Sequence, residues 1–317
     1  MTGNVRAWLD ARPWVWSFGA ALIVWLVTAL AVQGRGMLET LAVALQFATF
    51  YAIVGIGQML TIAAGPGNID LSIPGVMTFA GYVAIGMMNG GNAGLAAGIA
   101  AGVVIGLAAG AFNVGLIQGL RIPPMIGTLA AGFVFQSMAI AYSRTSHAAP
   151  APLLVSFSVA RVLGLPVIAL IFIVLTVLVS VALSRSVFGR SVLAIGQNAR
   201  AARLAGLAVR RTLGFVYLAS AVLAAVAGIL LSAYSGGAAL DMGTDYLLMS
   251  IAVVVLGGTS IAGGQASPAG LWGAAILLDL VVTMLNVMRV GAGLRYVVTG
   301  LIIIGVLALA KGREQAT

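Results

Sequence analysis

The sequence predicts an all-α integral membrane protein of about ten transmembrane helices, some of them discontinuous or re-entrant. Hydrophobic residues make up 62% of the chain and charged residues 7%, whereas soluble proteins average about half and about a quarter. The apolar residues fall in stretches of a length that can cross a hydrocarbon core of roughly 30 Å. Few positions remain outside these stretches, so we expect a single transmembrane domain over residues 1–317.

Ten apolar segments account for most of the chain. The first follows Arg6 and Arg12 and contains Ala-Leu-Ala at 29–31, a possible signal-peptidase site. This segment is longer than the apolar part of a signal peptide, and further spans follow it, so we expect a first helix that is retained. The expected spans are residues 15–32, 42–63, 73–88, 94–118, 124–142, 164–183, 212–234, 246–262, 268–288 and 294–310.

The basic residues predict which side of the membrane each loop occupies. With both termini in the cytoplasm, eleven of the 16 lysines and arginines are cytoplasmic, in agreement with the positive-inside rule. A mid-chain loop over about 185–211 is then cytoplasmic as well. The cytoplasmic set is Arg6, Arg12, Arg121, Arg185, Arg190, Arg200, Arg203, Arg210, Arg211, Lys311 and Arg313, and the outer set is Arg35, Arg144, Arg161, Arg289 and Arg295.

The fourth span repeats a glycine at every fourth position, in GLAAGIAAGVVIGLAAG. Small residues on one face of a helix let another backbone approach closely. We therefore expect this face to pack against a neighbouring helix and assign it no role in transport. The glycines are Gly94, Gly98, Gly102, Gly106 and Gly110.

Two segments interrupt the apolar pattern where hydrocarbon would otherwise surround the backbone. The first is AAGPGNIDLSIPGVM at 63–77, and the second is VVLGGTSIAGGQASPAG at 254–270. Irregular backbone at this depth is tolerated when it is buried in protein or lines a cavity, and paired interruptions point to a substrate pathway. The candidate pathway residues are Asn68, Asp70, Ser72, Thr259 and Ser260.

The alternative for these segments is purely structural. Asp70 and Ser72 stand where a helix start needs a cap, and Pro74 would lie in the first turn. The glycines would then only make tight turns. Both interpretations stay open at this point.

Several classes of function lack the residues that they need. The chain has no cysteine and a single histidine, His147, without a second ligand type nearby, so no metal site is expected. Lys311, the only lysine, follows no glycine-rich loop, which excludes a Walker A ATPase. No catalytic set is present, and we expect neither an enzyme, nor a cofactor on this chain, nor a nucleic-acid partner. An ion-coupled carrier would depend on Asp70 or Asp279.

The mid-chain loop contains FGRSVLAIGQNARAARLAGLAVRR at 188–211, with five arginines and no acid. Asn198 can cap a short helix that Gly206 ends, and Arg200 and Arg203 share one face of it. Such a helix is suited to docking on a soluble partner. The alternative is that the arginines serve the positive-inside bias or bind anionic lipid headgroups.

Four stretches together carry a family resemblance: AIGQNARAARLAGLAV, GNIDLSIPGVM, VVLGGTSIAGG and LRIPPMIGTLA. In this order and spacing they resemble the permease subunits of bacterial ATP-binding-cassette importers of the ribose and simple-sugar class, over nearly the whole chain. The resemblance implies that the mid-chain loop forms the coupling helix that contacts the ATPase. The residues implied in coupling are Gly196, Asn198, Arg200, Ala202, Arg203 and Gly206.

The resemblance also implies the partners. These are a cytoplasmic ATPase that binds ATP and magnesium, a second permease subunit, identical or similar, and a periplasmic solute-binding protein that contacts outward loops at 143–163 and 235–245. The location implied is the bacterial inner membrane, with membrane lipid around the chain.

The sequence departs from the sugar-type pattern at a few positions. Asn68 and Pro74 stand where glycine is commoner, Gln197 replaces a frequent glycine, and Arg200 lies where an acid is often found. Importers of branched-chain amino acids or nucleosides are therefore the nearest rivals. An ion-coupled carrier and a membrane scaffold that transports nothing are the contrary classes.

Overall fold

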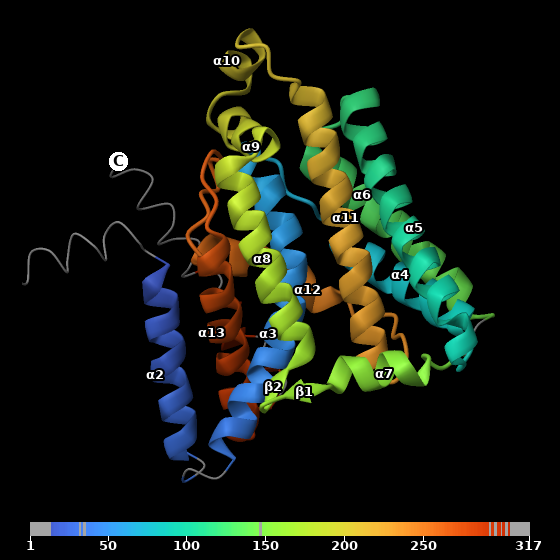
Figure 1. The fold of residues 1–317 in the computed structure, drawn as a ribbon, viewed down its shortest axis with the longest axis vertical. Helices are drawn as coiled ribbons and strands as arrows, with labels where there is room; N and C mark the ends of the chain where they lie inside the picture. The colour runs from blue at the N-terminus through green and yellow to red at the C-terminus, as the bar shows by residue number, and fades with distance from the viewer. Residues whose placement is uncertain are drawn as a thin grey trace, which may run out of the picture.

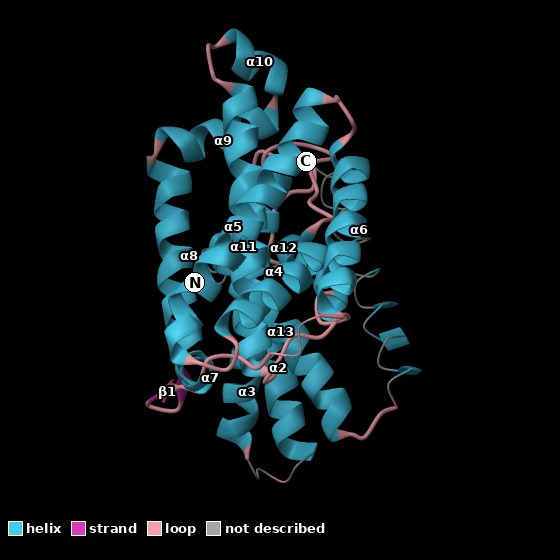
Figure 2. Cartoon of the chain, turned by 90° about the vertical axis from the view of Figure 1, so that its right-hand side faces the viewer, coloured by secondary structure: helices cyan, strands magenta, loops and turns pink. Residues whose placement is uncertain are grey.

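The computed structural model describes residues 14–31, 33, 36–145 and 148–291, together with 293–294, 297–298, 300–301 and 304. Within these residues the chain is almost entirely helical (Figures 1 and 2). The exception is a short antiparallel hairpin of β1 (Arg161–Val162) and β2 (Leu165–Pro166). The histidine at position 147 lies outside the described residues, as do the flanking basic residues of both termini.

The helices follow the predicted spans closely. Among the described residues, six helical stretches are long and apolar enough to cross a membrane, and three shorter helices are also apolar, so the multi-pass all-α class is confirmed. The count of ten stays a prediction, since most of the expected span at 294–310 is not described. The helices are α2 (Val15–Ala31), α3 (Met37–Ala63), α4 (Ile73–Met88), α5 (Leu95–Val114), α6 (Pro124–Ser143), α7 (Pro152–Val159), α8 (Val167–Arg185), α9 (Val187–Gln197), α10 (Ala199–Leu204), α11 (Val209–Tyr234), α12 (Thr244–Leu256) and α13 (Pro268–Val287), with single helical turns at η1 (Asn92–Gly94) and η2 (Gly115–Gly119).

Two predicted boundaries are wrong: α3 begins at Met37 and not near residue 42, and α12 ends at Leu256 and not near residue 262. Gly258 has a φ of +92°, and the amides of Gly258 and Thr259 donate to the carbonyl groups of Val255 and Val254. This pair of bonds is the Schellman arrangement that ends a helix at a left-handed glycine. The segment between α12 and α13 is therefore a longer loop than expected, at 257–267.

The core lies along α3, α4 and α11 in the middle of the bundle, with α5 and α6 on one side and α13 and α2 on the other (Figure 1). The small α10 projects from one end of the molecule, which we call the α10 end, and α7 with the hairpin lies at the opposite end (Figure 1). Both loops predicted to face outward, 143–163 and 235–245, begin at that opposite end.

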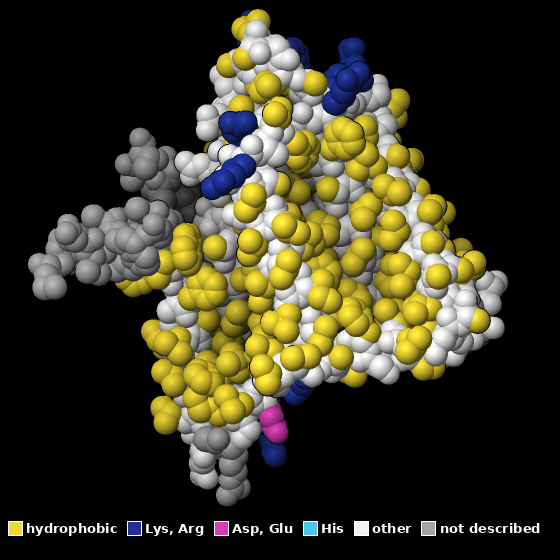
Figure 3. Space-filling model, in the orientation of Figure 1, with side chains coloured by type: hydrophobic (Ala, Val, Ile, Leu, Met, Phe, Trp, Pro, Cys, Tyr) yellow, Lys and Arg dark blue, Asp and Glu magenta, His cyan; other side chains and the backbone are white. Residues whose placement is uncertain are grey.

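Basic residues are concentrated at the α10 end, above a broad apolar belt (Figure 3). This asymmetry follows the charge pattern of the sequence and makes the α10 end the cytoplasmic side in the predicted orientation. Among described residues, the arginines of the α10 end are Arg121, Arg185, Arg190, Arg200, Arg203, Arg210 and Arg211, and those of the opposite end are Arg144, Arg161 and Arg289.

The glycine stripe of α5 packs as predicted. Gly98 faces α4, Gly102 lies against both Ile229 of α11 and Ala84 of α4, and Gly106 and Gly110 face α11. A Cβ atom added at Gly106 would lie 2.9 Å from the Cα of Val222, which is closer than real Cβ atoms come. The stripe therefore brings the α5 and α11 backbones together.

We expect Gly106→Ala to lower the free energy of unfolding by about 1 to 3 kcal/mol, because the added methyl overpacks a backbone contact. Gly115→Ala is the matched control, since it adds a methyl to a helical glycine with no neighbour within 4 Å. Thermal unfolding in detergent measures both. Equal midpoints for the two variants would contradict this account of the stripe.

Candidate functional site

The predicted short helix in the mid-chain loop is confirmed as α10. The side-chain oxygen of Asn198 accepts hydrogen bonds from the amides of Arg200 (3.0 Å) and Ala201 (2.9 Å). Gly206 has a φ of +84° and ends the helix, with the amide of Leu207 donating to the carbonyl of Ala202. Both ends of α10 are thus fixed by local bonds.

One face of α10 is anchored and the other is free. Ala202 is buried against Ile195 of α9 and Val209 of α11. Arg200 and Arg203 are exposed, and so is Leu204, with 85% of its surface accessible. The helix α10 lies beyond the end of the bundle (Figures 1 and 2), so its exposed face offers two arginines and a leucine to a partner.

Gly196, at the end of α9, brings three distant segments together. A Cβ atom at this position would overlap the carbonyl oxygen of Ala63 and the amide nitrogen of Gly264, which are hydrogen-bonded to each other at 2.9 Å. A Cβ at Gly263 would likewise lie 2.6 Å from the Cα of Gly65. We call these four glycines, Gly65, Gly196, Gly263 and Gly264, the glycine junction. Both interrupted segments thus meet the mid-chain loop at the α10 end.

The first interrupted segment is held in the core by Asp70. One carboxylate oxygen accepts from the amide (3.0 Å) and the hydroxyl (2.6 Å) of Ser72, and the other accepts from the hydroxyl of Ser220 on α11 (2.7 Å). The Asn113 amide of α5 donates to the Ser72 hydroxyl at 2.8 Å. We call Asp70, Ser72, Asn113 and Ser220 the Asp70 cluster; all four are at most 1% exposed.

Asp70 and Ser72 stand at the start of α4, as predicted, but their side chains do not cap that helix. Ser72 does stand at the N-cap position of α4, and Pro74 is in the first turn, but the Ser72 side chain accepts no bond from that turn. Its hydroxyl donates to Asp70 instead. A buried carboxylate needs every donor within reach, and the Ser72 hydroxyl is the nearest. The two residues therefore fasten α4 to α11 and do not cap it.

The same segment has further partners that the sequence analysis missed. The hydroxyl of Tyr217 on α11 donates to the Asn68 side chain at 3.1 Å, and the Thr128 hydroxyl of α6 accepts from the amide of Leu71 at 3.0 Å. Polar residues inside otherwise apolar spans were the available signal for Asn113, Thr128, Tyr217 and Ser220. The irregular backbone at 68–72 is satisfied by these neighbouring helices, as burial in a membrane requires.

Thr259 and Ser260 lie in a different place, in the loop at 257–267. The Thr259 hydroxyl accepts from the amide of Ser267 at 3.1 Å and so stabilises the start of α13. This loop is the one that contacts α9 through the glycine junction. Asp70 and Ser72 therefore lie deep in the bundle, and Thr259 and Ser260 lie at the α10 end. Asn68 is half-buried and lies beside Gly65 of the glycine junction.

A polar cavity of about 420 Å³ opens at the opposite end of the molecule. Tyr82 of α4, Ser143 at the end of α6 and Gly237 after α11 line it. Its walls include residues of both loops that were predicted to face outward, and two hydroxyl-bearing side chains, Tyr82 and Ser143.

Comparison with known proteins identifies the family. The family model described as "branched-chain amino acid transport system / permease component" matches residues 40–307. The chain belongs to this permease family. The resemblance to permease subunits of ATP-binding-cassette importers is confirmed, and the permease is a multi-pass protein of the inner membrane.

Two relatives are both named "Autoinducer 2 import system permease protein LsrD". The Yersinia enterocolitica relative is 30% identical over 267 residues, covering 82% of the permease and 80% of the relative. The Photorhabdus laumondii relative is 29% identical over 263 residues, covering 80% and 79%. No solved structure matches the permease.

We expect Asn198→Ala to loosen α10 by about 1 kcal/mol, since it removes the acceptor for two helix amides. Asn198→Asp keeps an acceptor in place and is the matched control. Hydrogen exchange of the amides at 199–205 of the permease reports the difference. Unchanged protection in Asn198→Ala would show that the bonds to Asn198 do not hold the helix.

Proposed function

We propose that the permease forms, together with a second permease subunit, the path of a sugar-like solute across the inner membrane, and that a separate ATPase drives transport through α10. The observation that carries this proposal is the exposed face of α10 on an anchored helix. The relatives' name supports a solute resembling autoinducer 2. ATP and magnesium would bind to the ATPase and not to this chain.

The contacts of α10 supply two mechanical routes into the membrane. Ala202 packs on Val209, the first residue of α11, and α11 bonds to the Asp70 cluster and to Asn68 through Ser220 and Tyr217. Through α9, the same loop reaches the glycine junction. Coupling requires an element with two arrangements, whose equilibrium is shifted both by the ATPase and by the solute. The helices α9, α10 and α11 together are suited to that role. The implied coupling set is Gly196, Asn198, Arg200, Ala202, Arg203 and Gly206.

The solute would meet the opposite end first. There, α7 and the β1–β2 hairpin offer a surface for a periplasmic solute-binding protein, next to the cavity with Tyr82 and Ser143. Hydroxyl groups suit a polar solute without charge. Asp70 and Ser72 are buried in this conformation, so their contact with solute would require α4 and α11 to separate. The candidate pathway residues remain Asn68, Asp70, Ser72, Thr259 and Ser260.

Buried polar atoms without a partner support a pathway through the same core. Both side-chain polar atoms of Gln58, the hydroxyl of Thr78 and the carbonyl oxygen of Asn113 have no hydrogen-bond partner within the described part of the permease. Such groups cost stability unless another state or a ligand satisfies them. They are the groups that a passing hydroxylated solute would bind.

Co-purification with the ATPase tests the proposal. The permease is co-expressed with the ATPase subunits of its host, as wild type and as the double variant Arg203→Glu with Leu204→Glu. The double variant makes the exposed face of α10 acidic where it was basic and apolar. The matched control is Val187→Glu with Arg190→Glu, an exposed apolar and basic pair on α9. We expect the amount of co-purifying ATPase to fall at least about tenfold in the α10 double variant and to stay unchanged in the α9 control, because central interface residues dominate affinity.

The result of the co-purification decides whether α10 contacts the ATPase, and solute uptake decides which class of solute is transported. Retention of the ATPase by both variants would remove α10 from the interface, and absence of any ATPase with the wild type would contradict the importer. Uptake into proteoliposomes is then compared for radiolabelled sugars and branched-chain amino acids. Uptake of leucine, but not of sugars, would replace the sugar-like solute by the one that the family description names.

A further inference from the structure

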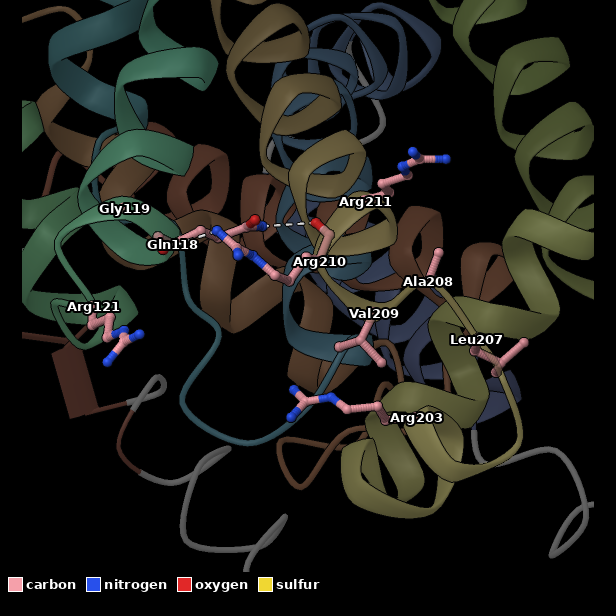
Figure 4. A pocket seen from close by; sticks show the side chains of 9 residues that line it. All are labelled: Gln118, Gly119, Arg121, Arg203, Leu207, Ala208, Val209, Arg210 and Arg211. Atoms are coloured by element: carbon pink, nitrogen blue, oxygen red, sulfur yellow. Dashed lines mark hydrogen bonds between the residues drawn. The ribbon is translucent and has the colours of Figure 1, made fainter.

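A basic groove of about 720 Å³ lies beside α10 and is not explained by the transport path (Figure 4). Its walls come from the end of the η2 turn, from α10, and from the linker and first turn of α11. Four arginines line it, Arg121, Arg203, Arg210 and Arg211, and no acidic side chain among the described residues does. Arg121, Arg203 and Arg210 border the same space, whereas Arg211 points away (Figure 4).

The position of Arg210 is fixed. Its guanidinium group donates to the carbonyl of Gln118 at 3.2 Å, and the Gln118 amide donates to the carbonyl of Arg210 at 2.8 Å. Arg210 and Arg211 occupy the first turn of α11, which contains no acid. Positive side chains are unfavourable at this positively polarised helix end. A bound anion would relieve that repulsion and the repulsion among the arginines.

The groove lies at the depth of lipid headgroups. Two apolar spans, Asn92–Gly119 and Val209–Tyr234, both end at its walls. Leu120, between the wall residues Gly119 and Arg121, is exposed, with 69% of its surface accessible. A molecule with an anionic head and an apolar tail matches these arginines beside an exposed apolar side chain at the end of two apolar spans.

We propose that the groove bounded by Arg121, Arg203 and Arg210 binds a phosphate group, supplied by an anionic phospholipid. Arginine recognises phosphate with paired donors, and juxtamembrane basic residues attract anionic headgroups. The same arginines could bind the phosphate group of a soluble molecule, so the experiment includes both a lipid and a soluble phosphate. Arg203 also belongs to the α10 face proposed to contact the ATPase, so the experiment uses the permease without the ATPase.

Native mass spectrometry of the full-length, delipidated permease in detergent tests the proposal. Phosphatidylglycerol and phosphatidylcholine are added at equal concentrations, and soluble pyrophosphate is added in a separate arm. We expect wild type to retain phosphatidylglycerol at least about tenfold better than phosphatidylcholine. Arg121→Gln with Arg203→Gln and Arg210→Gln is expected to bring that ratio close to one.

The matched control is Arg185→Gln with Arg190→Gln and Arg200→Gln, which removes the same charge at the same end but outside the groove. A preference that the control keeps and the groove variant loses supports the lipid site. Pyrophosphate binding that only the groove variant loses, without lipid preference, supports the phosphate site with a soluble source. Equal losses in both variants, or no binding by wild type, would overturn the proposal. Size-exclusion profiles check that each variant is folded.

Discussion

Gly196→Ala is expected to abolish solute uptake while leaving the ATPase bound. The added methyl group would overlap two backbone atoms, the carbonyl oxygen of Ala63 and the amide nitrogen of Gly264. Backbone atoms cannot rotate away as the end of a side chain can, so α9 must shift from the loop at 257–267. The free face of α10 does not change. We therefore expect uptake to fall at least about tenfold, with ATPase co-purification kept.

The measurement is uptake into proteoliposomes beside co-purification. Gly115→Ala is the control, because its added methyl meets no atom within 4 Å. Gly263→Ala tests the same junction from the other side, where a Cβ would lie 2.6 Å from the Cα of Gly65. Wild-type uptake in both junction variants would show that this contact transmits nothing.

Asp70→Ala is expected to cost the permease about 2 to 4 kcal/mol of stability, since it leaves the buried hydroxyls of Ser72 and Ser220 without their shared acceptor. In Asp70→Asn, the side-chain oxygen of the asparagine can still accept from Ser72. Its NH2 group can donate a hydrogen bond to the hydroxyl oxygen of Ser220. We expect Asn to recover most of the loss. Thermal unfolding of the two variants in detergent measures this difference.

Asp241→Ala is the matched control, because this acid is exposed and its loss should leave the midpoint unchanged. Equal midpoints for Asp70→Ala and wild type would show that the cluster does not hold α4 on α11. Uptake by Asp70→Asn separates the classes of transporter. An importer driven by ATP needs no proton or sodium gradient in either form, whereas uptake that follows such a gradient and is lost in Asp70→Asn would make the protein an ion-coupled carrier.

Local patterns in the sequence predicted much of the fold. The glycine period of α5 predicted a close helix contact, and Gly106 makes one with Val222. Asn198 and Gly206 predicted the ends of α10, because a cap and a left-handed glycine act on amides within a few residues. The early end of α12 was missed, because Gly257 and Gly258 mark an interruption in the sequence but do not by themselves say whether the helix ends there or continues to residue 262. The helix α7, inside a segment expected to be a loop, was missed as well.

The sequence by itself determined the membrane class, the mid-chain loop and the residues that make up its helix, since apolar length, charge bias and capping depend on neighbours along the chain. Only the tertiary structure decided what the interrupted segments touch. It placed Asp70 against Ser220 of α11 and brought Gly65, Gly196 and Gly263 into one junction. These contacts join positions far apart in the sequence. A glycine by itself is compatible with many tight turns and so does not indicate which distant segment it contacts. What selects their partners is the packing of whole helices, which no local pattern encodes.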